Sequence, residues 1–254
     1  MTGVSFIIGS AGSGKSELTA SLSEWLRRED QDVAIFNLDP GVLKTPYVPD
    51  IDIREYVNVQ DLMSEYGLGP NGGLVLAMDL AADYIESVNK EIAEMNPDHL
   101  IVDTSGQMEL FAYRASGTFF TNALHGETKA IVFLFDGMFC SDPRNFLSSV
   151  LLSSSIHYRF MLPVINILNK TDLLSEDVLK KEIRWSSRPQ SLIKSLEEHI
   201  KGEEILYLTK LTRLLHTYLG KTWFIPVSAR TLNNFSTFIA VITRILFKGE
   251  EKLS

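Results

Sequence analysis

The sequence Gly-Ser-Ala-Gly-Ser-Gly-Lys-Ser at residues 9–16 has the spacing of a phosphate-binding loop. Its glycines let the backbone curve so that several N–H groups point at phosphate oxygens. An apolar run precedes the loop and a helical pattern follows it, and the N-terminal end of a helix favours an anion. A flexible glycine loop, the alternative, needs no such flanking elements. We therefore predict a nucleoside triphosphate site in which Lys15 contacts the β- and γ-phosphates and the Ser16 hydroxyl binds Mg²⁺. The predicted nucleotide contacts here are Gly12, Ser13, Gly14, Lys15, Ser16 and Glu17.

A second motif, Asn-Lys-Thr-Asp at residues 169–172, directly follows another apolar run. The Asp172 carboxylate can accept hydrogen bonds from N1–H and the 2-amino group of guanine, whereas adenine has an acceptor at N1 and no 2-amino group. An unpaired buried polar group costs about 1–3 kcal/mol, so this carboxylate would discriminate between the purines. The stem of Lys170 can pack over the base, and Asn169 can brace the loop and the purine edge. A polar turn is the alternative, but the order of strand and motif favours guanine binding.

Ser228 and Ala229 follow the last apolar run of strand length. Backbone N–H groups in such a turn would bond to O6 of guanine. The dipeptide alone is a weak signal, and the motif at residues 169–172 strengthens it.

Two acidic residues stand at the ends of other predicted strands. Asp103 begins the sequence Asp-Thr-Ser-Gly-Gln and would hold Mg²⁺ through a water molecule. In that sequence the Gly106 N–H would contact the γ-phosphate, and Gln107 would orient an attacking water. Asp39 would complete the Mg²⁺ shell or accept a proton from that water. The alternatives are a solvated residue at a helix start for Gln107 and an Asx turn before a proline for Asp39.

These motifs require a scaffold that brings them to one edge. Runs of strand length recur between helical patterns and are apolar almost throughout, as in a parallel sheet buried on both faces. Crossover helices put the carboxyl ends of parallel strands on the same edge. We predict an α/β, Rossmann-like P-loop fold with a mostly parallel central sheet flanked by helices. The predicted strands are residues 4–8, 33–38, 99–102, 130–135, 164–168 and 223–227, and the clearest helices are 16–28, 79–95 and 234–247.

Two segments exceed this alternation: residues 41–78, and residues 175–222, whose apolar spacing predicts two or three added helices. We expect a single domain over residues 1–248 and a polar, frayed tail at 249–254.

The bulk composition narrows the class of protein. The 254 residues carry a formal net charge of −8, which argues against electrostatic binding to nucleic acid or an anionic membrane. Cys140 is the only cysteine, so no internal disulfide can form. The longest apolar run is far too short to cross a bilayer, and a strand beginning within four residues leaves no room for a signal peptide. We expect a cytoplasmic protein.

The order of these motifs, together with Gly-Pro-Asn at residues 69–71, resembles the GPN-loop GTPases of the SIMIBI class of P-loop proteins. The resemblance extends from the phosphate loop to Ala229. It implies a Rossmann-like parallel sheet with an added helical region, and a dimer, which we expect to be a homodimer. It further implies that Asn71 enters the active site of the partner, with Pro70 stiffening the loop and Gly69 permitting its turn.

The sequence departs from the family pattern at Ser105, at Ser16 and at residues 39–41, which match the family's second region only loosely in length and flanks. Ser105 stands where the family usually has proline, and Ser16 where threonine is commoner. Glu109 matches an acidic family position. Arg54 is a candidate interface residue, with a surface ion pair to Asp52 or Glu55 as the alternative.

The resulting hypothesis is Mg²⁺-dependent hydrolysis of GTP to GDP and phosphate. Lys15, Asp39, Asn71 and Gln107 are the predicted catalytic residues, and Ser16, Asp39 and Asp103 are the predicted metal ligands. The resemblance favours a nucleotide-dependent switch in protein assembly with a client such as RNA polymerase. An unassisted housekeeping GTPase is the alternative, and a P-loop kinase with a small acceptor is a third.

Overall fold

The computed structural model describes residues 1–220 and 222–247, and the predicted tail at 249–254 lies outside them. Seven strands form one sheet in the order β3-β2-β4-β1-β5-β6-β7, and every strand pair is parallel. This confirms the predicted α/β class. The strands are β1 (Gly3–Gly9), β2 (Val33–Leu38), β3 (Ile51–Asp52), β4 (His99–Thr104), β5 (Thr128–Asp136), β6 (Val164–Asn169) and β7 (Trp223–Pro226).

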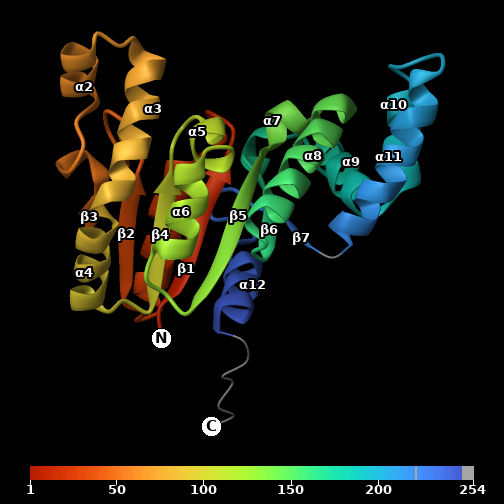
Figure 1. Cartoon of the computed structure of the whole chain (residues 1–254). Helices are drawn as coiled ribbons and strands as arrows, with labels where there is room; N and C mark the ends of the chain where they lie inside the picture. The colour runs from red at the N-terminus through yellow and green to blue at the C-terminus, as the bar shows by residue number, and fades with distance from the viewer. Residues whose placement is uncertain (221, 248–254) are drawn as a thin grey trace.

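Helices cover both faces of the sheet, which explains why its strands are apolar almost throughout. Successive side chains of β1 enter opposite layers: Phe6 and Ile8 belong to the larger core and Ile7 to the smaller one. The smaller core is closed by α1 (Lys15–Arg28) and α12 (Phe235–Phe247). The larger core receives α5 (Met108–Ala112), α6 (Ala115–Ala123), α7 (Gly137–Cys140) and α8 (Pro143–Phe160) (Figure 1).

A helical projection stands over the β3 end of the sheet (Figure 1). The single helix predicted at residues 79–95 is divided: α3 ends at Ala81 and α4 begins at Ile85, with a 3₁₀ turn between them. Apolar spacing alone does not mark this break, because it continues across the turn. The elements are η1 (Ile53–Glu55), α2 (Val59–Tyr66), α3 (Pro70–Ala81), η2 (Ala82–Tyr84) and α4 (Ile85–Met95).

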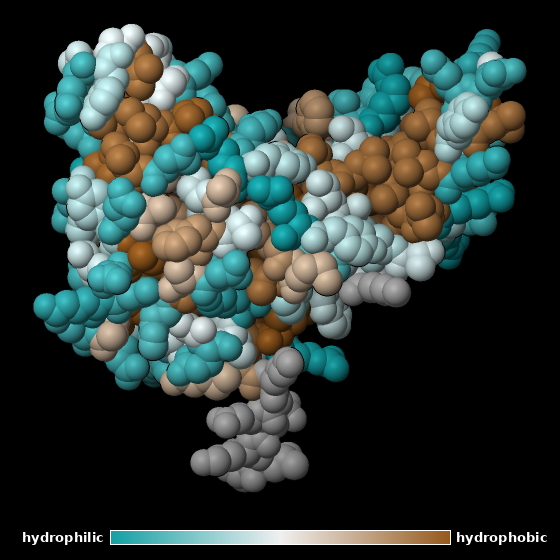
Figure 2. Space-filling model, viewed as in Figure 1, coloured by the Kyte–Doolittle hydropathy of each residue, from teal (hydrophilic) through white to brown (hydrophobic). Residues whose placement is uncertain are grey.

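A second projection follows β6 and is composed of η3 (Thr171–Leu173), α9 (Glu176–Ser187), α10 (Pro189–Glu197) and α11 (Glu204–Leu219) (Figure 1). It packs against α8: the buried ring of Trp185 lies 5.5 Å from that of Phe146, and its Nε1 donates to Ser195 Oγ over 3.1 Å. Hydrophobic side chains also gather on the surface of this projection (Figure 2), where Leu206 and Leu214 of α11 are exposed. None of the described helices combines the length and hydropathy needed to span a bilayer.

Candidate nucleotide-binding site

The predicted motifs meet at the carboxyl edge of the parallel sheet. The phosphate loop leaves β1, and β1 lies between β4 and β5 in the sheet order. Asp39 follows β2, Asp103 lies in β4, and the motif at residues 169–172 leaves β6. Loops that leave the carboxyl ends of such strands form the usual ligand crevice of this architecture.

The phosphate loop has the conformation that its glycines permit. Gly14 has φ 93°, and a Cβ there would lie 2.5 Å from Nδ2 of Asn169, so both backbone and space require glycine. The Lys15 ammonium donates to the carbonyl of Gly9 over 2.8 Å and to that of Ser10 over 3.0 Å. Burial lowers the pKa of Lys15, while Asp103 opposes the shift. These two bonds hold the Lys15 ammonium at the phosphate loop.

The motif at residues 169–172 is tied to the phosphate loop by direct hydrogen bonds. Asn169 Nδ2 donates to the Ser13 carbonyl over 3.0 Å. Lys170 Nζ donates to the Gly12 carbonyl over 2.6 Å and pairs with Asp136 over 2.6 Å. These contacts fix the relative position of two loops that are more than 150 residues apart in the sequence.

A pocket of about 340 Å³ opens beside this junction. The Asp172 carboxylate on its wall accepts a hydrogen bond from Ser228 Oγ over 2.7 Å. The Ala229 N–H, which the sequence assigned to guanine O6, donates instead to Asn169 Oδ1 over 3.1 Å. The pocket is lined by Gly14, Glu17, Asn169, Lys170, Asp172, Leu173, Ala229 and Arg230. It has the polar wall and the size that a planar base requires.

Asp39 and Gly106 are joined by a hydrogen bond, and the charge of Asp39 acts on Lys15. The Gly106 N–H, which the sequence assigned to the γ-phosphate, donates to Asp39 Oδ2 over 2.7 Å. Asp39 Oδ1 accepts from the Gly41 N–H over 3.0 Å, which is the Asx turn considered as an alternative. Gln107 is exposed and occupies the N-cap position of α5, but its side chain makes no hydrogen bond to the helix N-terminus. Glu109, also exposed, acts electrostatically on Lys15.

Asp103 is the most buried carboxylate of the site, with 2% of its surface exposed. Burial raises its pKa to about 6, and hydrogen bonds from Tyr47 and Ser16 oppose the shift. Its Oδ1 has no hydrogen-bond partner among residues 1–220 and 222–247. Ser16, Asp103 and the nearby Asp39 supply the hard oxygen donors that Mg²⁺ prefers. No cluster of three or more His, Cys, Asp or Glu side chains suited to a metal occurs in the described part of the chain. The donor set therefore fits a cation that takes its remaining ligands from phosphates and water.

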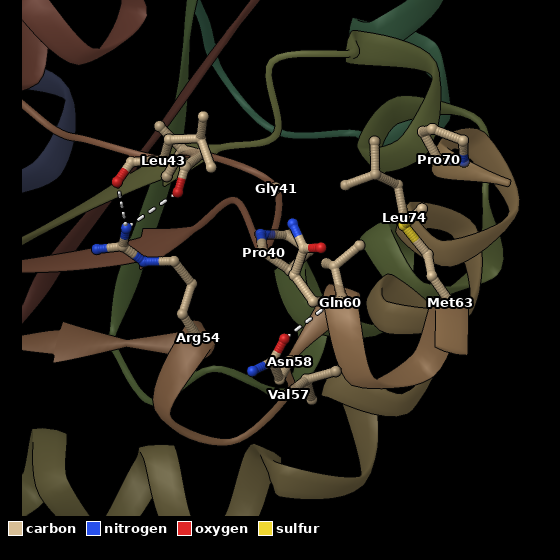
Figure 3. Close-up of a pocket in the computed structure, with 12 residues that line it drawn as sticks. Pro40, Gly41, Leu43, Arg54, Val57, Asn58, Gln60, Met63, Pro70 and Leu74 are labelled. Carbon is tan, nitrogen blue, oxygen red and sulfur yellow. Dashed lines mark hydrogen bonds between the residues drawn. The ribbon is translucent and has the colours of Figure 1, made fainter. Parts of the chain in front are cut away.

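The Gly-Pro-Asn segment is the start of a helix. Gly69 is the N-cap of α3 with φ −74°, a value open to any residue, so the turn does not depend on glycine there. Pro70 occupies the first turn, a favoured position for proline, and Asn71 is exposed. Pro70 lines a pocket of about 440 Å³ shared with Gly41 and Leu43 (Figure 3).

Arg54 is a structural residue in this chain. Its guanidinium pairs with Asp52 over 2.5 Å and donates to the Val42 carbonyl over 2.9 Å. It also contacts the Leu43 carbonyl (Figure 3). The ion-pair alternative is thus the observed one, and the partner is Asp52, with a side chain only 9% exposed. Sequence reasoning also missed Tyr47, whose hydroxyl bonds to Asp103. No motif surrounds that tyrosine, so only the fold brings it to the site.

Comparisons with known proteins agree with this geometry. A family described as conserved hypothetical ATP binding proteins matches residues 7–247. GPN-loop GTPase 1 of Saccharomyces cerevisiae is 32% identical over 248 residues, which cover 93% of this chain and 64% of that protein. GPN-loop GTPase 1 of Schizosaccharomyces pombe is 34% identical over 254 residues, covering 97% and 69%. The chain thus spans less than two thirds of the S. cerevisiae protein. The crystal structure of a GTPase from Pyrococcus abyssi in the apo form has a TM-score of 0.85 at 28% identity, covering 95% of this chain and 96% of that one.

Proposed function

The chain belongs to the family of GPN-loop GTPases, and from this premise we propose that it binds GTP with Mg²⁺ and hydrolyses it to GDP and phosphate. The observation that carries the proposal is the Asp172 carboxylate on the wall of a pocket that opens directly onto the phosphate loop. The matching family is described as binding ATP. A carboxylate at this position, however, accepts hydrogen bonds from N1–H and the 2-amino group of guanine, whereas adenine presents only an acceptor there. The chemistry of this wall therefore favours GTP.

Asp172 retains the capacity that base selection needs. Ser228 occupies one of the roughly four lone-pair sites of a carboxylate. The remaining sites suffice for N1–H and the 2-amino group of guanine. Asn169 and Lys170 hold the loop against the phosphate loop, so base and phosphates are gripped by one connected unit. The Ala229 N–H would reach O6 only by sharing or exchanging its bond to Asn169.

The phosphates would be bound by Lys15 and the groups around it. The loop N–H groups and the ammonium would meet the charge that develops on the transferred phosphoryl group. Ser16 and Asp103 would hold Mg²⁺, directly and through water, with Asp39 in the outer shell. The metal, when bound, supplies neutralisation of the phosphate oxygens.

Asp39 and Gln107 are the groups proposed to align the attacking water. The Asp39 carboxylate, which can accept a proton, accepts a hydrogen bond from the Gly106 N–H. The same N–H is the group proposed to contact the γ-phosphate. A γ-phosphate taking that N–H would leave the carboxylate beside the attacking position. Gln107 is exposed next to it and free of side-chain capping. We propose that these two residues align the water for in-line attack.

Asn71 is proposed to complete the site of a second copy in a homodimer. Its exposure in the first turn of α3 supports a role toward another chain. We mix an Asn71→Ala chain with a Lys15→Ala chain and measure phosphate release. Each variant alone should be slow, whereas the mixed dimer retains one intact composite site and should recover part of the rate. No recovery, with mixed dimers demonstrated by native mass spectrometry, would argue against sharing in trans.

In the cell we propose a nucleotide-dependent switch in the assembly of a protein complex, with a client such as RNA polymerase. The exposed leucines of α11 offer a surface for that client. A slow intrinsic rate that rises with a protein partner supports this role. Fast unassisted turnover supports the second candidate, a housekeeping hydrolase.

The decisive experiment compares GTP and ATP by calorimetry with Mg²⁺ and follows phosphate release. We expect GTP alone to bind tightly and to be cleaved to GDP. Lys15→Ala should abolish both, while Lys194→Ala, an exposed lysine on α10, should match the parent. Equal binding of ATP and GTP would refute the assignment of Asp172. Phosphate transfer to an acceptor instead of water would indicate a kinase.

A further inference from the structure

Tyr47 covers the buried carboxylate of Asp103. Its hydroxyl donates a hydrogen bond to Asp103 Oδ2 over 2.7 Å. The tyrosine belongs to the loop between β2 and β3, and the aspartate lies in β4, so the bond joins two elements that are 56 residues apart. This tyrosine has no part in the nucleotide contacts already described.

The loop that carries Tyr47 is braced rather than free. Arg54 Nη1 donates to the carbonyl of Val42 over 2.9 Å and also contacts that of Leu43 (Figure 3). Thr45 Oγ1 donates to the carbonyl of Tyr47 itself over 2.7 Å. The guanidinium is in turn fixed by its pair with a carboxylate of β3. The phenol is therefore presented to β4 by a loop that Arg54 holds at Val42 and Leu43.

The bond leaves the second oxygen of Asp103 for a ligand. Oδ1 is buried and lacks a hydrogen-bond partner in the described part of the chain. Such an orphaned acceptor is unfavourable, and Ser16 and Lys15 both act on the same carboxylate. A donor that arrives with the ligand, such as a water molecule of a hydrated cation, would satisfy it. One oxygen is thus held by the protein, and the other is unpaired among the described residues.

The Tyr47 hydroxyl is the donor in this bond, because a carboxylate oxygen accepts. A carboxylate that binds a metal or its waters is commonly oriented by a hydrogen bond from a neighbouring group. A fixed donor on Oδ2 restricts rotation of the carboxyl plane of Asp103.

We propose that Tyr47 is a positioning residue for the Mg²⁺ site: its hydrogen bond to Oδ2 orients the Asp103 carboxylate so that Oδ1 is left for the hydrated cation. The proposal rests on the proposed function, because Asp103 serves Mg²⁺ only if the nucleotide binds with the metal. It assigns to the loop between β2 and β3 a contribution to metal affinity.

The test is a Mg²⁺ titration of the protein loaded with a fluorescent, non-hydrolysable GTP analogue. Tyr47→Phe keeps the ring and deletes only the donor. We expect the analogue to bind within about twofold of the parent in EDTA, and the half-saturating Mg²⁺ concentration to rise about tenfold or more, as is typical when a partner of a metal ligand is removed. Tyr56→Phe is the matched control, since it deletes another tyrosine–carboxylate bond, that to Glu91, away from the site. It should leave the Mg²⁺ titration unchanged.

Two results would overturn the proposal. An unchanged Mg²⁺ half-saturation in Tyr47→Phe would show that the donor does not position Asp103. A loss of analogue affinity that is equal in EDTA and in Mg²⁺ would show that the tyrosine only supports the fold. The parent chain separates these from failure of the proposed function: if it binds no guanine nucleotide, or binds it without regard to Mg²⁺, both proposals fall.

Discussion

Replacing Asp172 with asparagine tests base recognition with a change of one atom. Ser228 Oγ already donates to Oδ1 of the carboxylate over 2.7 Å, so the guanine edge depends on the remaining lone pairs. The asparagine amide nitrogen would turn a donor toward the 2-amino group, which is itself a donor. A hydrogen bond to a charged group is worth about 1.5–3 kcal/mol, so GDP affinity should fall by a factor of about 10 to 150.

The same substitution should create a new preference. Xanthine carries a carbonyl where guanine has the 2-amino group, so the amide nitrogen of the variant can donate to it. We therefore expect the affinity for XDP to rise while that for GDP falls, measured by competition against a fluorescent nucleotide. Asp177→Asn provides the control, because Asp177 is an equally exposed aspartate outside the pocket. Retention of GDP affinity within about twofold in Asp172→Asn would refute the reasoning. A loss of affinity would not reflect unfolding, since the free energy of unfolding should change by no more than about 0.5 kcal/mol at an exposed site.

Two further predictions concern stability. Glu182 on α9 is fully buried, neither of its carboxylate oxygens has a partner among the described residues, and burial raises its pKa to about 8 from an ordinary 4.5. The unfolded chain releases this proton at lower pH than the folded one, so the group destabilises the fold increasingly from about pH 5 to pH 8. Glu182→Gln should therefore raise Tm by roughly 3–8 °C at pH 8 and by much less at pH 5. Equal Tm shifts at the two pH values would contradict this. Arg54→Ala removes the ion-pair partner of the largely buried Asp52 and the anchor of the loop between β2 and β3, so the free energy of unfolding in urea should fall by roughly 2–3 kcal/mol. Arg54→Lys should restore only part of this loss, because lysine lacks the planar guanidinium group.

The sequence was sufficient for the scaffold because the strands are continuous apolar runs. The predicted strand at residues 33–38 coincides with β2, and the others differ from observation only by a few residues at their ends. β3 was missed because Ile51–Asp52 is only two residues long and carries no pattern of its own. The break between α3 and α4 was missed because the helical spacing persists through it.

The site was predictable where one short segment contains the whole chemistry, as in the phosphate loop. It was not predictable where the contact joins isolated residues across the sheet. Tyr47 reaches Asp103 only because β2 and β4 are neighbours in the sheet. The bond between Asp39 and the Gly106 N–H likewise depends on the three-dimensional approach of two loops. The ion pair of Arg54 with Asp52, by contrast, is one of the alternatives that the sequence itself indicates, because the two residues are close in the chain.

The order of the strands has a consequence for how the protein is made. β1 is synthesised before its neighbours β4 and β5, which begin roughly 100 and 125 residues further along the chain, at His99 and Thr128. Ser228 and Ala229, which brace the base pocket, follow β7 and are synthesised later than all of these strands. During synthesis the residues at the base pocket are therefore added after the phosphate loop and the strands beside it.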